Sequence, residues 1–207
     1  MDFARFIQMI ESQTLWFSRL DRFEDPLEGG HTDAELAGIR KHVEQAEQLI
    51  GVFRAARKDT YVSCWRAGKS ESLAMWDLYG RGSGIVAVKS TVGLLKEAVE
   101  SYGERIFISQ VRYIDWSERS GLDNVLVACS RKDLSYQHED EVRAILSNIV
   151  PPSETGIAVP VDINGLVTEI MVGPREKEWV VQLTDQVKKR YELPQLVIAS
   201  DRLKPRR

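Results

Sequence analysis

The sequence has few cysteines and no long apolar run. Its two cysteines, Cys64 and Cys129, show no C-x-x-C spacing and have no histidine at ligand spacing. We therefore expect neither a zinc cluster nor a disulfide framework. No apolar run approaches the roughly 18 residues of a membrane span. The start, MDFARFIQMIESQ, carries acids and lacks the basic and then apolar profile of a secretory signal. These features predict a cytoplasmic protein without a membrane partner.

An excess of charge of one sign is also lacking. The 28 basic and 31 acidic residues give a formal net charge of -3, so no overall field attracts nucleic acid or anionic lipid. With 207 residues, 43% of them apolar, the chain can bury a substantial core. The simplest organisation is a single domain over residues 1–207.

Hydrophobic spacing predicts a mixture of helices and strands. The apolar positions of residues 3–10 fit a helix, and the β-prone TLWFS that follows fits a strand. A T-x-x-E capping box at Thr32 opens a helix predicted to continue to residue 59. Further strands are predicted at 59–65, at 83–91 and, as one long strand, at 105–116, and a helix is predicted at 94–99.

The C-terminal part predicts a βαβ unit, with a strand at 166–173, a helix at 175–191 and a strand at 193–200. The apolar segment 122–130 fits a helix or a strand. Together these elements predict an α+β fold, with a mixed, mostly antiparallel sheet flanked by helices.

Several separated stretches resemble a bacterial family, the domain-of-unknown-function family numbered 2971. The stretches are LWFSRLDRFEDPLEG (15–29), YVSCW (61–65), LAMWDLYG with GIVAVK (73–89), RKDLSYQHEDEVRAIL (131–146) and IMVGP (170–174). The resemblance spans nearly the whole chain. Members commonly have Asn where this chain has Glu24, and they commonly begin with an extra strand before the first helix. The family name implies no chemistry.

The order of these motifs is also similar to that of mono-ADP-ribosyltransferases. These enzymes have an aromatic first strand, a later short strand with a central Ser, a Tyr on the next element and an E-x-E near a final core strand. A polar residue of the first strand and the Ser strand hold NAD, and the last Glu acts on the nicotinamide ribose. The resemblance implies an ADP-ribosyltransferase-like layout, NAD as substrate, a protein or nucleic-acid acceptor, and a toxin or phage-defence context.

The E-x-E stretch supplies the catalytic candidates. If residues 139–146 form a strand, alternation places Glu139, Glu141 and Arg143 on one side of it. Glu141 would then stabilise the oxocarbenium-like ribose, and Glu139 would orient the acceptor or serve as its base. Arg143 would pair with Glu141 or hold a phosphate oxygen. The same residues also fit a helix with a solvated charged face, on which Glu139 and Arg143 make an ordinary i,i+4 pair.

Further candidates come from the other motifs. Ser63 suits a ribose or amide contact, and Trp65 suits stacking on nicotinamide. Arg19 and Tyr79 complete the candidate NAD contacts. Each has a structural alternative, since aromatic residues usually pack in cores and single arginines usually lie on the surface.

Three more residues are candidates for lining the site, namely Asp25, Trp76 and His138. Asp25 precedes a proline, which also fits a plain turn, and in the functional interpretation it borders the cleft together with Glu28. Trp76 suits a core position equally well. His138 has no second histidine at ligand spacing, so no metal site is expected there.

Two other functions fit the sequence. One is a noncatalytic module that binds a protein or an oligonucleotide, with the charged residues forming a structural network. The other is a metal-dependent nuclease, with Mg²⁺ held by Glu139 and Glu141 near Lys132. An enzyme should place Glu141 within reach of Ser63 and Tyr79 in one pocket, whereas a binding module can leave them apart or fully packed.

Overall fold

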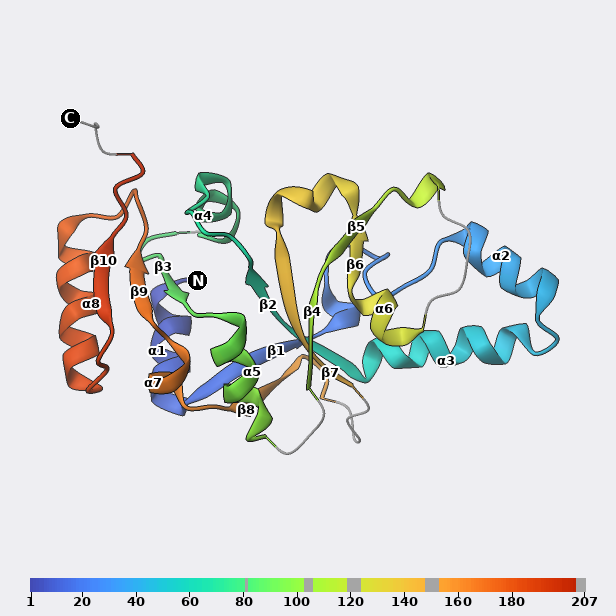
Figure 1. Ribbon diagram of the computed structural model, residues 1–207, viewed down its shortest axis with the longest axis horizontal. Helices are drawn as coiled ribbons and strands as arrows, with labels where there is room; N and C mark the ends of the chain where they lie inside the picture. The colour runs from blue at the N-terminus through green and yellow to red at the C-terminus, as the bar shows by residue number, and fades with distance from the viewer. Residues whose placement is uncertain (81, 103–105, 119–123, 148–152, 204–207) are drawn as a thin grey trace. The chain divides into compact units, whose positions relative to one another are not determined.

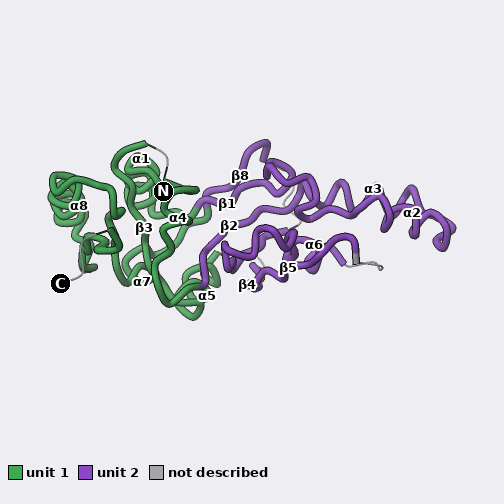
Figure 2. Tube along the Cα trace, turned by 90° about the horizontal axis from the view of Figure 1, so that it is seen from above, with its two compact units in different colours: residues 1–15, 68–103, 159–207 green, residues 16–67, 104–158 purple. Residues whose placement is uncertain are grey.

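The computed structural model describes residues 1–80, 82–102, 106–118, 124–147 and 153–203 (Figure 1). The chain divides into two compact units (Figure 2): unit 1 comprises residues 1–15, 68–103 and 159–207, and unit 2 comprises residues 16–67 and 104–158. Both units combine helices with strands, and most of the described strand pairs are antiparallel, which confirms the predicted α+β class. No helix of the described segments is long and apolar enough to cross a membrane. The assignment of residues 1–207 to one domain stays a prediction.

A five-stranded sheet, in the order β4-β7-β2-β1-β8, organises unit 2. Its strands are β1 (Thr14–Arg19), β2 (Thr60–Arg66), β4 (Ile106–Gln110), β7 (Glu141–Ser147) and β8 (Gly156–Pro160). β2 pairs antiparallel with both β1 and β7, and β4 pairs antiparallel with β7. Aromatic and β-branched residues dominate β2, as the sequence predicts for a buried strand.

The other elements of unit 2 contribute polar groups as well as core residues. They are η1 (Leu20–Arg22), α2 (Asp33–His42), α3 (Ala46–Lys58), β5 (Arg112–Ile114), η2 (Trp116–Glu118), α6 (Val125–Cys129), β6 (Arg131–Asp133) and η3 (Leu134–Glu139). β5 and β6 form a separate parallel pair. Against the sheet, Leu20 and Cys129 pack on Val62 and Ile145 in one buried cluster.

Two predictions for unit 2 are wrong in detail. The helix predicted over 32–59 is two helices, because the chain becomes extended at Val43 and turns back so that Ile39, Ala46 and Ile50 bury one another. The capping box at its start is confirmed: the Thr32 hydroxyl accepts from Glu35 N, and Thr32 N donates to the Glu35 carboxylate.

The single long strand predicted over 105–116 is also wrong. Residues 106–110 form β4 and residues 112–114 form β5; the two strands separate at Val111 because each pairs with a different strand. Residue 105 lies outside the described residues. The apolar segment 122–130, left open by its sequence, contains the helix α6, which Asn124 caps by accepting from Val127 N at 2.9 Å. Residues 122 and 123 lie outside the described residues.

A three-stranded sheet, in the order β10-β9-β3, organises unit 1. The unit contains α1 (Phe3–Ser12), α4 (Leu73–Tyr79), β3 (Val86–Lys89), α5 (Val92–Glu100), α7 (Ile163–Leu166), β9 (Glu169–Val172), α8 (Glu178–Arg190) and β10 (Leu196–Ala199). β9 and β10 are parallel and are connected through α8, which confirms the predicted βαβ unit. Ahead of α1, Asp2 forms an antiparallel bridge with Ile85.

The packing of β8 against β1 leads to a first prediction. A Cβ atom on Gly156 would lie 2.4 Å from the Trp16 ring and 2.5 Å from the Phe17 carbonyl oxygen, and the carbonyl cannot give way easily. We expect Gly156→Ala to lower the free energy of unfolding by about 1–3 kcal/mol. Gly51→Ala is the matched control, because nothing lies near its added Cβ and it sits inside α3.

Gly51→Ala should therefore stabilise the protein by about 0.5–1 kcal/mol. Urea titration of both variants provides the measurement. Equal unfolding midpoints for Gly156→Ala and the unmodified protein would contradict the close approach of β8 to Trp16.

Candidate functional site

The stretch proposed to carry the chemistry is extended only from Glu141 onward. Glu139 ends the 3-10 helix η3, and Asp140 adopts a left-handed conformation with φ 44°. Aspartate tolerates this conformation better than most residues, and here it turns the chain from η3 into β7. The prediction of a strand over 139–146 is therefore confirmed for 141–146 and wrong for its first two residues.

The register of β2 against β7 decides which candidates meet. Residues directly opposite each other in an antiparallel pair project to the same face. Cys64 lies opposite Arg143, whereas Ser63 lies opposite Ala144. Because Glu141 shares the face of Arg143, Ser63 is on the other face of the sheet. The expectation that Ser63 borders the same hollow as Glu141 is thus wrong; its hydroxyl accepts from Trp65 Nε1 at 3.2 Å.

Arg143 is the centre of a buried set of ion pairs. Its guanidinium is 0% exposed and donates through all three nitrogens. Nε and Nη2 bind the two carboxylate oxygens of Glu141 at 2.8 and 3.0 Å. Nη2 also binds Glu28, and Nη1 donates to the Cys129 carbonyl at 2.9 Å. The bidentate geometry with Glu141 is the strong form of an arginine–carboxylate pair.

Lys132 completes this set from β6. Its Nζ lies 2.7 Å from a Glu139 oxygen, 3.1 Å from Glu28 and 3.8 Å from Glu141. It also lies 4.5 Å from the centre of the Tyr136 ring. We call Glu28, Lys132, Glu139, Glu141 and Arg143 the charge cluster; each is at most 6% exposed. These charged residues can lie beside the core because they pair with one another there.

A second buried pair extends the polar interior toward α2. Arg131 Nη1 lies 3.3 Å from Glu35, and its Nη2 donates to the Gly30 carbonyl at 2.7 Å. The guanidinium lies 4.9 Å from the Trp116 ring centre. Glu35 is also the capping-box residue of α2, so one carboxylate both caps the helix and binds the strand β6.

Three members of the cluster, Lys132, Glu141 and Arg143, stay ionised at neutral pH. Burial raises the pKa of Glu141, but hydrogen bonds from Arg143 and its charge outweigh burial, so the pKa lies below its ordinary value. Burial lowers the pKa of Arg143 and of Lys132, but their carboxylate partners raise both pKa values above the ordinary range. Each buried charge is therefore stable in its ionised form only while its oppositely charged partners are in place.

Cys64 is the exposed neighbour of the cluster. Its thiol hydrogen-bonds the Glu141 carboxylate, and the backbone N of Glu141 donates to the Tyr113 hydroxyl at 2.9 Å. The motif analysis missed Cys64, although alternation along β2 places it on the opposite face from Ser63. Desolvation by the surrounding protein and repulsion by Glu141 raise the pKa of the Cys64 thiol well above its ordinary value.

Two other candidates in unit 2 are Arg19, which lies far from Glu141, and Asp25, which forms a turn. Arg19 lies opposite Tyr61 of β2, and Tyr61 lies opposite Leu146 of β7. Leu146 is five residues along β7 from Glu141, so this level of the sheet is roughly 16 Å from Glu141. Arg19 binds Asp21 at 2.6 Å and the Ser153 carbonyl. Asp25 forms a turn by accepting from Leu27 N at 2.8 Å.

The remaining candidates are exposed or half-buried. His138 is exposed, and its Nδ1 lies 3.2 Å from the Ser135 carbonyl oxygen. Trp76 and Tyr79 belong to α4 in unit 1. The Trp76 ring donates to Glu71 at 3.1 Å, and Tyr79 is 57% exposed. Trp65 is half-buried in β2.

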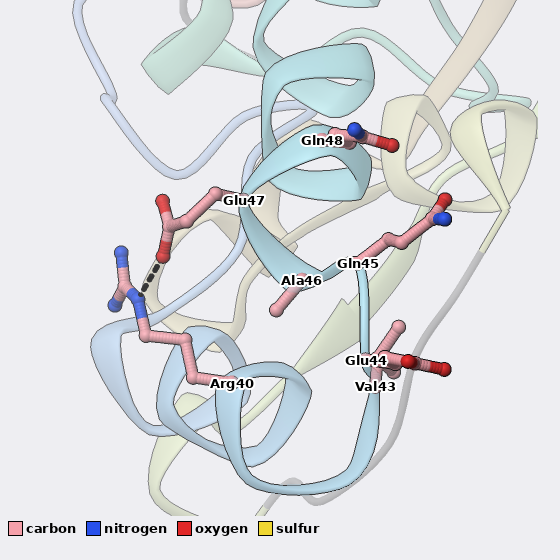
Figure 3. Close-up of a pocket in the computed structure, with 7 residues that line it drawn as sticks. All are labelled: Arg40, Val43, Glu44, Gln45, Ala46, Glu47 and Gln48. Carbon is pink, nitrogen blue, oxygen red and sulfur yellow. Dashed lines mark hydrogen bonds and ion pairs between the residues drawn. The ribbon is translucent and has the colours of Figure 1, made fainter.

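A shallow pocket lies elsewhere in unit 2, at the turn between α2 and α3 (Figure 3). Its lining residues are Arg40, Val43, Glu44, Gln45, Ala46, Glu47 and Gln48. Arg40 and Glu47 pair across it at 2.6 Å. The pocket contains no residue of the charge cluster and no residue predicted from the motifs.

The acids of the cluster do not form a metal centre. Within the described part of the chain, no group of three or more His, Cys, Asp or Glu residues is arranged to hold a metal ion. The Lys132 ammonium lies 2.7 Å from Glu139 and 3.8 Å from Glu141, the two acids that hold Mg²⁺ in the nuclease hypothesis.

No family model matches the chain, and no curated protein or solved structure is significantly similar to it. The resemblance to the domain-of-unknown-function family numbered 2971 therefore stays a prediction from the motifs.

The cluster predicts a specific acid sensitivity. Glu141→Gln removes one charge and leaves Arg143 buried with less compensation, so the free energy of unfolding at neutral pH should fall by about 3–5 kcal/mol. Because the folded pKa of Glu141 is lowered, its contribution is present above the ordinary carboxyl pKa and is lost as the pH falls through the folded pKa.

Denaturant titrations at several pH values measure this effect. The unfolding free energies of Glu141→Gln and of the unmodified protein should converge in acid. Glu47→Gln, at an exposed pair, is the control and should change stability little at any pH. If Glu141→Gln lowers the unfolding free energy by the same amount at every pH, the stabilisation does not come from the ionised Glu141, and the assignment is contradicted.

The environment of Cys64 predicts slow thiol chemistry. Only the thiolate reacts with iodoacetamide, so the raised pKa should make the exposed Cys64 react more slowly at neutral pH than an unstructured cysteine peptide, with a rate that climbs as the pH rises. Cys129 is buried, and burial raises its pKa to about 11, so it should not react in the folded protein. Mass spectrometry of Cys64→Ser separates the two sites; fast labelling of Cys64 at neutral pH would contradict its placement beside Glu141.

Proposed function

We propose that unit 2 is a noncatalytic binding module whose charge cluster holds its fold together. The observation that carries this proposal is the complete pairing of the cluster. Both oxygens of Glu141 bind Arg143, Glu139 binds Lys132, and neither carboxylate is more than 6% exposed. A carboxylate that acts on a substrate must be within hydrogen-bond reach of it.

The separation of the motif residues supports the same proposal. Ser63 and Glu141 lie on opposite faces of the sheet, and Arg19 lies at the far end of β1. A catalytic site needs its groups held in one geometry around the reacting atoms. The separate positions of Ser63, Glu141 and Arg19 fit a binding module, in which these residues have structural roles.

The partner that we propose is a protein. Unit 2 carries 18 acidic and 14 basic residues. Of the basic residues, Arg131, Lys132 and Arg143 are buried in ion pairs and are not available to a partner. An oligonucleotide partner requires accessible cations that neutralise phosphates. Unit 2 also exposes the large apolar side chains of Trp16, Val52 and Phe107, which suit a protein surface.

A second candidate is the NAD-dependent mono-ADP-ribosyltransferase-like enzyme that modifies a macromolecule. One observation favours it: β1, β2 and β7, which carry the three motif elements, are neighbours in one sheet. In this candidate Glu141 is the catalytic carboxylate, and NAD approaches from the exposed Cys64 rather than from Ser63.

Incubation of the purified protein with nicotinamide-labelled NAD and a cell lysate distinguishes the two functions. The binding module should release no nicotinamide and transfer no ADP-ribose, and affinity capture should retain a protein partner after nuclease treatment. Nicotinamide release by the unmodified protein would overturn the binding module in favour of the transferase, and its loss in Glu141→Gln, at a temperature where circular dichroism shows the variant folded, would assign the release to Glu141. Capture that is abolished by nuclease would instead point to an oligonucleotide.

A further inference from the structure

The strand β10 is an edge strand of the sheet in unit 1. It ends the strand order β10-β9-β3, and β9 is the one described strand with which it pairs. Two of its four residues expose large apolar side chains: Leu196 is 67% exposed and Ile198 is 38% exposed. An uncharged, apolar edge strand is a template for pairing with another strand.

The backbone of β10 alternates between groups that face β9 and groups that face outward. Ser200 N donates to the Val172 carbonyl on the β9 side. In a parallel pair, every second residue directs its N–H and C=O to the same neighbour, so Ile198 and Leu196 also face β9. Val197 and Ala199 therefore direct their backbone groups away from the sheet.

We propose that β10 pairs with β10 of a second copy of this chain, antiparallel and around a twofold axis. The outward groups fix which registers are possible, because a hydrogen-bonded pair in an antiparallel ladder needs outward groups on both strands. Val197 must then lie opposite Val197 or Ala199 of the partner subunit. A pairing of Val197 with Ile198 is excluded by the direction of the backbone groups.

The register centred on Val197 buries the exposed side chains most completely. It places each Leu196 opposite Ile198 of the partner subunit, in a pair that is not hydrogen-bonded, where side chains approach most closely. The contact forms twice because the interface is its own complement. The centre of β10 carries neither proline nor lysine, the residues that usually protect an edge strand.

Sedimentation equilibrium of the full chain over a wide concentration range tests this dimer. We expect a monomer–dimer equilibrium for the unmodified protein and a dissociation constant at least about tenfold higher for Ile198→Lys. Val197→Pro should have a similar effect, because it removes an outward N–H and keeps the bonds to β9. Val52→Lys, at an exposed apolar residue of α3 in unit 2, is the matched control and should dimerise like the unmodified protein.

Circular dichroism of each variant verifies that it is folded. A monomer at every concentration of the unmodified protein would overturn the proposal, whatever the variants do. A dimer that Ile198→Lys and Val197→Pro leave unchanged would overturn it as well, by placing the interface elsewhere.

Discussion

The buried guanidinium of Arg143 is the group on which the structure of unit 2 depends. It binds Glu28 from the loop after η1, Glu141 on its own strand and the carbonyl of Cys129 at the end of α6. Removing an ion from water costs several kcal/mol, and the cost is recovered only when the ion's donors are all satisfied. Arg143 therefore ties two further segments to the sheet, the loop of Glu28 and the end of α6, and both must be in place for its donors to be satisfied.

Lys132 and Arg131 repeat this arrangement on β6, which pairs with β5 outside the five-stranded sheet. Lys132 binds Glu28 and Glu139, and Arg131 binds Glu35 at the start of α2. Glu28 connects the two halves, because one oxygen meets Arg143 and the other meets Lys132. Such a network specifies how the short elements assemble on the sheet more than it adds net stability. In the proposed binding module, recognition of a partner is then left to the exposed surface.

The sequence predicted local features well and pairings across the chain poorly. Apolar spacing identified β1, β2, β3 and the βαβ unit but missed β6 and β8, and alternation correctly grouped Glu141 with Arg143. Alternation could not reveal that Glu28, 115 residues away along the chain, would fill the space beside Arg143. The expectation that Ser63 lies within reach of Glu141 was wrong because the register between β2 and β7 is a tertiary property. The left-handed turn at Asp140, which detaches Glu139 from the strand, also lacks a strong sequence signal.

A double-mutant cycle between Glu28 and Arg143 tests the central claim most directly. Unfolding free energies are measured for the unmodified protein, Glu28→Gln, Arg143→Met and the double variant. If the buried pair holds the loop to the sheet, the two substitutions should be strongly non-additive, with a coupling energy of about 1–3 kcal/mol. Additivity within about 0.5 kcal/mol would mean that the two residues act independently, and would contradict the account.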